Sequence, residues 1–183
     1  MEFEVVVNSR RSIRKFSATD VPDELVKSLI ETAVRAPSSM NGQPWCFIIV
    51  RNLETKRLLA ELKDKYCPPE KREYPACFLQ EAPVIVVICV EQAKSYDRGM
   101  ESGILATGHL LLAAANHGLT GVYLSAYKSG TPEVSDDIRS ILGLPADIDP
   151  ITIVPIGYPG ELPEPKTIKK AGEVIFNEAY CRK

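Results

Sequence analysis

Two short segments near the start of the chain carry side chains that can bind a phosphorylated molecule. The first, RRSIRKF at residues 10–16, is a basic run around one serine: Arg10, Arg11, Ser12, Arg14 and Lys15. Arginine has a planar fork of N–H donors that matches phosphate oxygens, and it stays charged at any working pH. A solvated basic surface is the alternative interpretation of such a run.

The second segment, APSSMNGQPW at residues 36–45, is rich in hydroxyl and amide groups. Such groups both donate and accept hydrogen bonds, which suits a heterocycle with carbonyls and ring nitrogens. A plain turn between a helix and a strand explains the same composition. Its last residue, Trp45, is either a core residue or a stacking platform. Together the two segments indicate a phosphorylated, hydrogen-bonding cofactor lying between them.

The elements that must position these segments alternate between helical and strand patterns. In residues 22–35, apolar positions recur at helical spacing, with Asp20 as the expected cap and Pro22 in the first turn. Further helices are expected at 53–66 (with a charged outer face), 102–118 and 131–143, and strands at 46–50, 82–91, 121–127 and 149–159. The sequence therefore predicts one mixed domain over residues 1–183, with 160–183 as an arm packed on a partner subunit.

Composition narrows the functional classes. The chain has 183 residues, 45% of them hydrophobic, and a net charge of −2, so nothing global attracts it to nucleic acid or to an anionic membrane. It begins without a signal-peptide pattern and has no apolar run of membrane-spanning length, which predicts a cytoplasmic protein. The phosphate-binding motifs GxGxxG and GxxxxGK[ST] are both absent.

The five cysteines and two histidines suggest neither a metal site nor a catalytic dyad, because their spacing is irregular. Cys89 is expected to be a core residue, and Cys46 is either a buried thiol or a neighbour of the cofactor. A disulfide between Cys67 and Cys77 is an open alternative. His109 is expected in the core or an interface. Because the sequence shows no recognisable pair of catalytic acid and base, we expect an organic cofactor to carry the chemistry.

The order of motifs over some 170 residues resembles the flavin-dependent nitroreductase family. RRSIRKF and APSSMNGQPW resemble the opening of that family, ILATGHLLLAAANHGLTGVYL its central helix and next strand, and ILGLPADIDPITIVPIGYPGELPEPK its closing segment. The resemblance implies an α+β fold with a mixed sheet wrapped by helices. It also implies an interlocked homodimer with FMN at the interface.

The resemblance also assigns roles to residues. Arg10, Arg11, Ser12 and Arg14 match the group that holds the phosphate, the ribityl chain and the pyrimidine edge. Pro37, Ser38, Ser39 and Asn41 match the segment placed against the ring system from the partner chain, and Gln43 is expected near the ribityl chain or ring. Leu124 and Ser125 match the strand end whose amides face flavin N5, and Ile156 and Gly157 match a turn beside the flavin.

Three positions depart from the family pattern. Ile168 occupies the slot of a basic phosphate ligand, and Lys169 is expected to replace it. Gly108 and His109 stand where the family's central helix usually has Gln-Asn or Glu-His. Ser125 replaces a common glycine.

The implied activity is ping-pong oxidoreduction, in which NADH or NADPH reduces FMN and an oxidised acceptor then takes the hydride. Nitroaromatics, quinones and free flavins are the expected acceptors. The alternatives are other chemistry on the same fold, such as dehalogenation, flavin fragmentation or dehydrogenation, and a flavin-binding redox sensor. Residues 64–80 are the candidate lid, whose Lys65, Lys71 and Arg72 could attract an acidic substrate.

Overall fold

The computed structural model describes residues 1–68, 75–163 and 165–180. Its helices are α1 (Phe3–Ser9), α2 (Asp23–Ala33), α3 (Leu53–Lys65), α4 (Phe78–Glu81), α5 (Gly99–Asn116), α6 (Glu133–Leu142) and α7 (Ala171–Val174), with short 3₁₀ turns η1 (Ser39–Asn41) and η3 (Gln92–Lys94). Its strands are β1 (Trp45–Val50), β2 (Val84–Glu91), β3 (Thr120–Gly121), β4 (Leu124–Ser125) and β5 (Ile148–Gly157). The longer helices and strands expected from the sequence are confirmed, with shifted ends.

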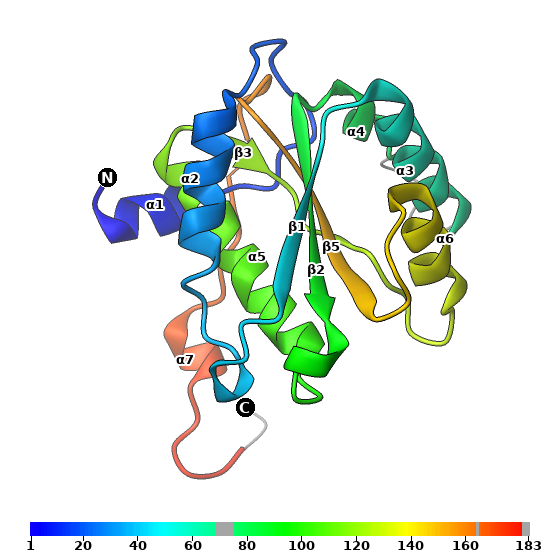
Figure 1. Ribbon diagram of the computed structural model, residues 1–183. Coiled ribbons are helices and arrows are strands. Elements are labelled where there is room, and N and C mark those ends of the chain that lie inside the picture. The colour runs from blue at the N-terminus through cyan, green and yellow to red at the C-terminus, as the bar shows by residue number, and fades with distance from the viewer. Residues whose placement is uncertain (69–74, 164, 181–183) are drawn as a thin grey trace.

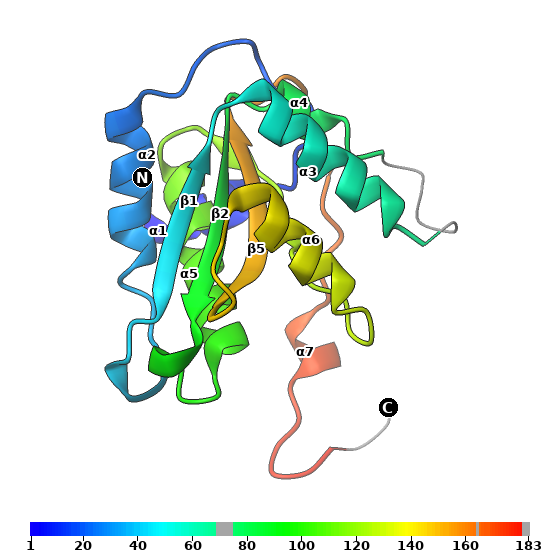
Figure 2. The same ribbon diagram turned by 45° about the vertical axis from the view of Figure 1, so that its right-hand side comes forward.

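One sheet with the strand order β1-β2-β5-β3 forms the middle layer, and β4 pairs with β5 as well. All pairings between these strands are antiparallel, and the mixed character comes from a parallel bridge between Ser12 and Gly121. Helices α2 and α5 cover one face, and α3, α4 and α6 cover the other (Figures 1 and 2). The predicted α+β architecture is therefore confirmed.

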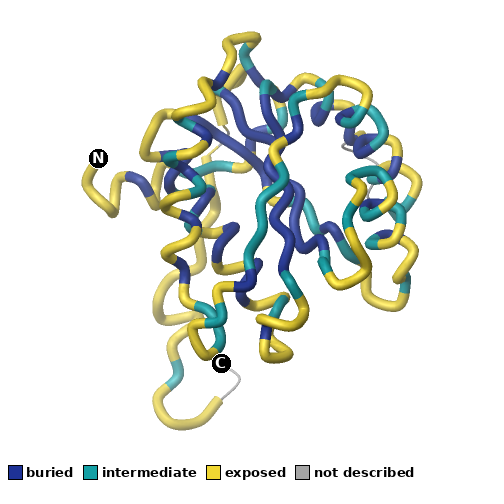
Figure 3. Tube along the Cα trace, in the orientation of Figure 1, coloured by how far each residue is buried: buried dark blue, intermediate teal, exposed yellow. Residues whose placement is uncertain are grey.

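The core lies on both faces of β2, whose residues Val84 to Val90 are all buried (Figure 3). Side chains alternate along a strand, so Val86 and Ile88 pack toward α2 and α5, while Val87 and Cys89 pack toward α3 and α6. The prediction that both faces of this strand are covered is confirmed, and Cys89 is a core residue.

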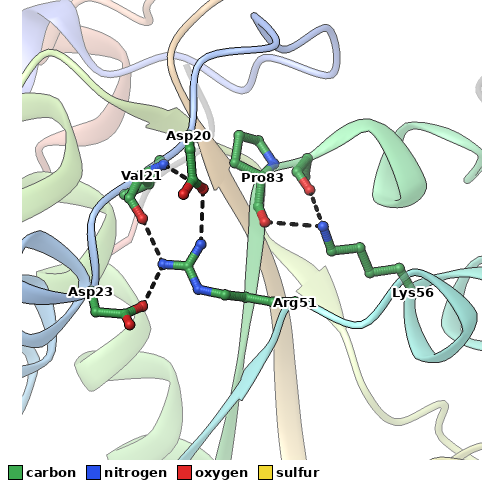
Figure 4. Close-up of polar contacts among 7 residues, drawn as sticks. Asp20, Val21, Asp23, Arg51, Lys56 and Pro83 are labelled. Carbon is green, nitrogen blue, oxygen red and sulfur yellow. Dashed lines mark hydrogen bonds and ion pairs between the residues drawn. The ribbon is translucent and has the colours of Figure 1, made fainter.

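The start of α2 differs from the expectation. Asp20 does not cap the helix, because the N-cap position is Pro22. Instead Arg51, just after β1, donates to Asp20 at 3.0 Å, to Asp23 at 2.8 Å and to the carbonyl of Val21 at 2.5 Å (Figure 4). The Asp20 carboxylate therefore binds the guanidinium of Arg51 and does not cap the N–H groups of α2. This ion pair ties the start of α2 to the end of β1.

The expected strand 121–127 is interrupted, and the partner strand explains why. β3 and β4 pair with β5 in one continuous register, in which Gly121 faces Ile156 and Leu124 faces Ile153. In that register Val122 stands opposite Pro155, which has no N–H to donate. The ladder therefore stops after β3 and resumes at β4.

Candidate functional site

Residues 10–17 form an extended segment beside the end of the sheet. Ser12 bridges Gly121 of β3, and the N–H of Gly160 donates to the carbonyl of Lys15 at 2.8 Å. A Cβ atom at Gly160 would lie 2.8 Å from the backbone of Phe16, so only glycine permits this approach. The basic run is thus held on two sides by backbone contacts.

The side chains of this segment differ in burial. Ile13 and Phe16 are buried, which leaves Ser12 and Lys15 exposed. Arg10, Arg11 and Arg14 are half-buried, and a cavity of about 220 Å³ opens beside the first two, lined also by Thr120 and Glu161. The arginines are therefore partly inset into the surface, unlike a basic face lying fully in solvent.

Ser125 presents its backbone to the outer edge of the sheet. Ala126 donates its N–H to the carbonyl of Ile151 at 2.9 Å, which makes that pair a hydrogen-bonded one in the register of β4 and β5. Bonded and non-bonded pairs alternate in an antiparallel ladder, so the Ser125–Thr152 pair is non-bonded. Both the N–H and the carbonyl of Ser125 consequently point away from β5.

The polar segment 37–43 lies elsewhere in the chain. It follows α2, whereas the basic run precedes that helix, and Figure 1 shows η1 at the lower end of the molecule. Ser38 Oγ accepts from the N–H of Gln43 at 3.0 Å, while Asn41 and Gln43 have positive φ angles and are exposed. Pro37 is also exposed and Ser39 is half-buried. The segment thus lies at the other end of α2 from the end that the basic run leads into.

Three further predicted residues, Ile156, Gly157 and Lys169, have surroundings that the sequence did not indicate. Ile156 and Gly157 are the last residues of β5, not a turn, and both are buried. Lys169 is exposed in the tail before α7, and no described residue pairs with it. The tail exposes Leu162, with 95% of its surface accessible, and Ile175.

Four cysteines carry free thiols: Cys46, Cys67, Cys77 and Cys89. The disulfide considered between Cys67 and Cys77 is therefore not formed. Cys46 and Cys89 stand directly opposite on β1 and β2. A hydrogen bond between them lowers the pKa of Cys46 and, together with burial, raises the pKa of Cys89. Trp45 donates its indole N–H to the carbonyl of Ser102 at 2.9 Å, which is a structural contact to α5.

Part of the candidate lid, residues 64–80, lies outside the residues that the structure describes. Lys71 and Arg72 lie outside the described residues. Lys65 is exposed and forms an ion pair of 2.8 Å with Asp137 of α6, so its charge is already matched. Within the described residues no group of histidines, cysteines and carboxylates could hold a metal ion. Those residues also contain no helix long and apolar enough to cross a membrane.

Two lysines of α3, Lys56 and Lys63, make contacts that their sequence context does not indicate. The charged outer face expected for residues 53–66 does not include these two, because both turn toward the protein. Lys56 is buried and donates to the carbonyls of Ala82 at 2.5 Å and Pro83 at 3.0 Å (Figure 4). Lys63 donates to the carbonyl of Ser125 at 2.6 Å. Their spacing of seven residues, which is two helical turns, is the signal that places them on one face.

Comparisons with known proteins extend over almost the whole chain. A protein of Methanothermobacter thermautotrophicus, which carries the provisional name NADH dehydrogenase/NAD(P)H nitroreductase, is 31% identical over 86% of this chain and 77% of its own. An iodotyrosine deiodinase of Thermotoga neapolitana is 30% identical over 94% of this chain and 96% of its own.

A solved structure is similar to this chain over nearly its whole length. The FMN-dependent nitroreductase of Clostridium difficile superposes with a TM-score of 0.82 at 25% identity, covering 97% of this chain and 99% of that one. The model of the nitroreductase family matches residues 7–158, which include the basic run, the polar segment and both edge strands. The chain therefore belongs to the nitroreductase family, a family of oxidoreductases.

Proposed function

We propose that this protein is an FMN-dependent NAD(P)H oxidoreductase. Family membership supports this, as do the names of the relatives, among them an FMN-dependent nitroreductase. The observation that carries the proposal is the arrangement along one edge of the sheet. The basic run pairs with Gly121, and the outward N–H of Ser125 follows four residues later in the same register, about 14 Å away.

The residues along this edge fit an elongated ligand with a phosphate at one end and a ring system at the other. Arg10, Arg11 and Arg14 supply cationic donors for the phosphate and the pyrimidine edge, and Ser12 supplies a hydroxyl for the ribityl chain. Leu124 and Ser125 would supply the backbone groups that face N5. Lys169 is the candidate for an added phosphate contact from the tail.

The polar segment serves a second copy of the chain in this proposal. Pro37, Ser38, Ser39, Asn41 and Gln43 would contact the flavin bound to the partner subunit, which makes the active unit a homodimer. Their position at the other end of α2 supports such an exchange, because one chain presents the two halves in different places (Figure 1). Ile156 and Gly157 would support the site through β5, since their burial leaves little surface for direct contact.

When bound, FMN would be the hydride carrier between NADH or NADPH and a nitroaromatic, a quinone or a similar acceptor. The protein binds, orients and tunes this group. The arginines would hold the anionic end, and the outward N–H of Ser125 would be the donor to the ring system. Such fixed donors in a preorganised site supply the catalytic effect by proximity and electrostatics. No side-chain acid or base is assigned.

Reductive dehalogenation is the second candidate. The Thermotoga deiodinase matches this chain nearly end to end, so the same scaffold supports that chemistry in a relative of similar length. Release of iodide from an iodotyrosine by the reduced protein, at a rate above that for a nitroaromatic, would favour this candidate over the first.

The test is an absorption spectrum of the purified protein, recorded before and after anaerobic addition of NADH and then of NADPH. We expect a flavin spectrum that is bleached by one of the two nucleotides and restored by a quinone or nitroaromatic. Bound flavin that neither nucleotide reduces would point to other chemistry on this fold. A protein that stays colourless after incubation with FMN would overturn the proposal.

A further inference from the structure

Lys63 is a cation placed against the edge of the sheet that the proposed function uses. It lies in the last turn of α3 and is half-buried, and its ammonium is 2.6 Å from the carbonyl oxygen of Ser125. This contact joins residues 62 positions apart in the chain. It fixes the peptide that follows Ser125 and so fixes the direction of the strand end.

The charge on Lys63 has no counter-ion among the residues that the structure describes. The ion pairs found there involve other lysines, for example Lys65 with Asp137 and Lys94 with Glu91. Burial lowers the pKa of Lys63, and its charge is weakly screened because water is partly excluded. An uncompensated positive charge in such surroundings stabilises negative charge on a neighbouring group.

The Ser125 N–H lies on the same side of β4 as Lys63. A residue's N–H and carbonyl point to the same edge of a strand, and for Ser125 that edge faces away from β5. A group that accepts from the Ser125 N–H therefore lies on the side where the ammonium already binds the Ser125 carbonyl. The N–H donor of Ser125 and the positive charge of Lys63 therefore lie next to the same part of the proposed site.

We propose that Lys63 is a positioning residue that sets both the orientation of the Ser125 backbone and the redox potential of the bound flavin. This inference rests on the proposed function. A positive charge beside a flavin stabilises the electron-rich reduced form relative to the oxidised form, so Lys63 raises the midpoint potential. The residue touches neither nicotinamide nor acceptor and acts through the Ser125 peptide and through its field.

The experiment compares the midpoint potential of bound FMN in the wild type with that in Lys63→Met and Lys63→Gln. Glutamine retains a donor for the Ser125 carbonyl without the charge, so it tests the field even where methionine weakens folding. We expect the equilibrium between reduced and oxidised flavin to shift about tenfold toward the oxidised form, which is a fall of about 30 mV for two electrons. Lys63→Arg, which keeps the charge, should restore most of the potential.

Lys65→Met is the matched control, because it removes the same charge two residues away on the same helix, where the ammonium faces Asp137. Its potential should equal that of the wild type. A Lys63→Gln protein with bound FMN and an unchanged potential would overturn the role of Lys63 while leaving the proposed function intact. A wild type that binds no FMN would overturn both, and the two failures are thus distinguishable.

Discussion

The arginines of the basic run are the residues on which flavin binding should depend most directly. In the proposed site, Arg10→Ala combined with Arg14→Ala would remove two charge-assisted contacts to the phosphate, each worth about 1.5–3 kcal/mol. We therefore expect the double variant to be purified without flavin and to bind added FMN at least a hundredfold more weakly in a fluorescence titration. The exposed Lys15→Ala, in the same run, is the control and should keep its flavin. Equal flavin content in the double variant would contradict the assignment.

Residue types alone identified the basic run but could not show which of its side chains are inset. Ile13 and Phe16 are buried while Ser12 and Lys15 are exposed, and this depends on where the segment lies, which is set by contacts such as the bridge from Ser12 to Gly121, more than a hundred residues away in sequence. Local composition carries no information about such a partner. The same limit applies to Lys63: its spacing from Lys56 places both on one helix face, but its acceptor, the backbone carbonyl of Ser125, could not be predicted from residue types.

At the scale of elements, α3 and α6 are joined by Asp137. The carboxylate accepts from Lys65 at 2.8 Å and from the hydroxyl of Tyr66 at 2.9 Å. These two bonds, the one from Lys65 first, lower the pKa of Asp137 below its ordinary value. A carboxyl with a lowered folded-state pKa stabilises the fold above its unfolded-state pKa, and this stabilisation is lost as the pH falls through the folded-state pKa.

We therefore expect Asp137→Asn to lower the urea midpoint relative to the wild type at pH 7. The difference should shrink as the pH falls below 3.8, the ordinary value for this carboxyl. Urea unfolding at several pH values measures this, with Asp147→Asn as a control at an exposed aspartate in the loop before β5. A gap between Asp137→Asn and the wild type that stays constant with pH would show that the ionised carboxylate does not join the two helices.

The helices and long strands could be predicted from periodicity because each buries one continuous apolar stripe or run. Residues 84–90 are an example, since a short apolar run rich in β-branched residues is typical of a strand covered on both faces. The break between β3 and β4 could not be read from residues 121–127, because its cause is Pro155 on the opposite strand. Asp20 looked like a cap for the same reason, as its true partner Arg51 lies thirty-one residues away.

For the molecule as a whole, an apolar surface on α1 and α5 supports the proposed homodimer. Phe3 is 71% exposed, Leu105 44% and Ile104 38%, and a cavity of about 370 Å³ lined by Phe3, His109 and Leu112 lies on the same side. A stable monomer rarely leaves so many large apolar residues of neighbouring helices in water. We expect this surface to be the interface with the second subunit.

Leu105→Glu should convert the protein to a monomer at micromolar concentration, since it places a charge in the proposed interface. Sedimentation velocity measures the mass, and the flavin spectrum measures the cofactor, which should be lost together with the dimer. Leu53→Glu is the control, because Leu53 is equally large and 64% exposed but begins α3 on the other face of the sheet. A monomeric Leu105→Glu protein with tightly bound FMN would contradict a site shared between subunits.

The separation of the basic run from segment 37–43 has a genetic consequence. A Cβ atom at Gly42 would lie 2.2 Å from the carbonyl oxygen of Lys94, so a larger residue there displaces segment 37–43 and nothing in the basic run. In a mixed dimer of one chain altered at Gly42 and another altered at Arg10, one site receives both defects and the other receives none. In the proposed homodimer, two inactive alleles of this gene would then complement each other to about a quarter of wild-type activity, because half of the randomly assembled dimers are mixed and each has one intact site. A mixed dimer of a doubly altered chain and an unaltered chain would have no intact site.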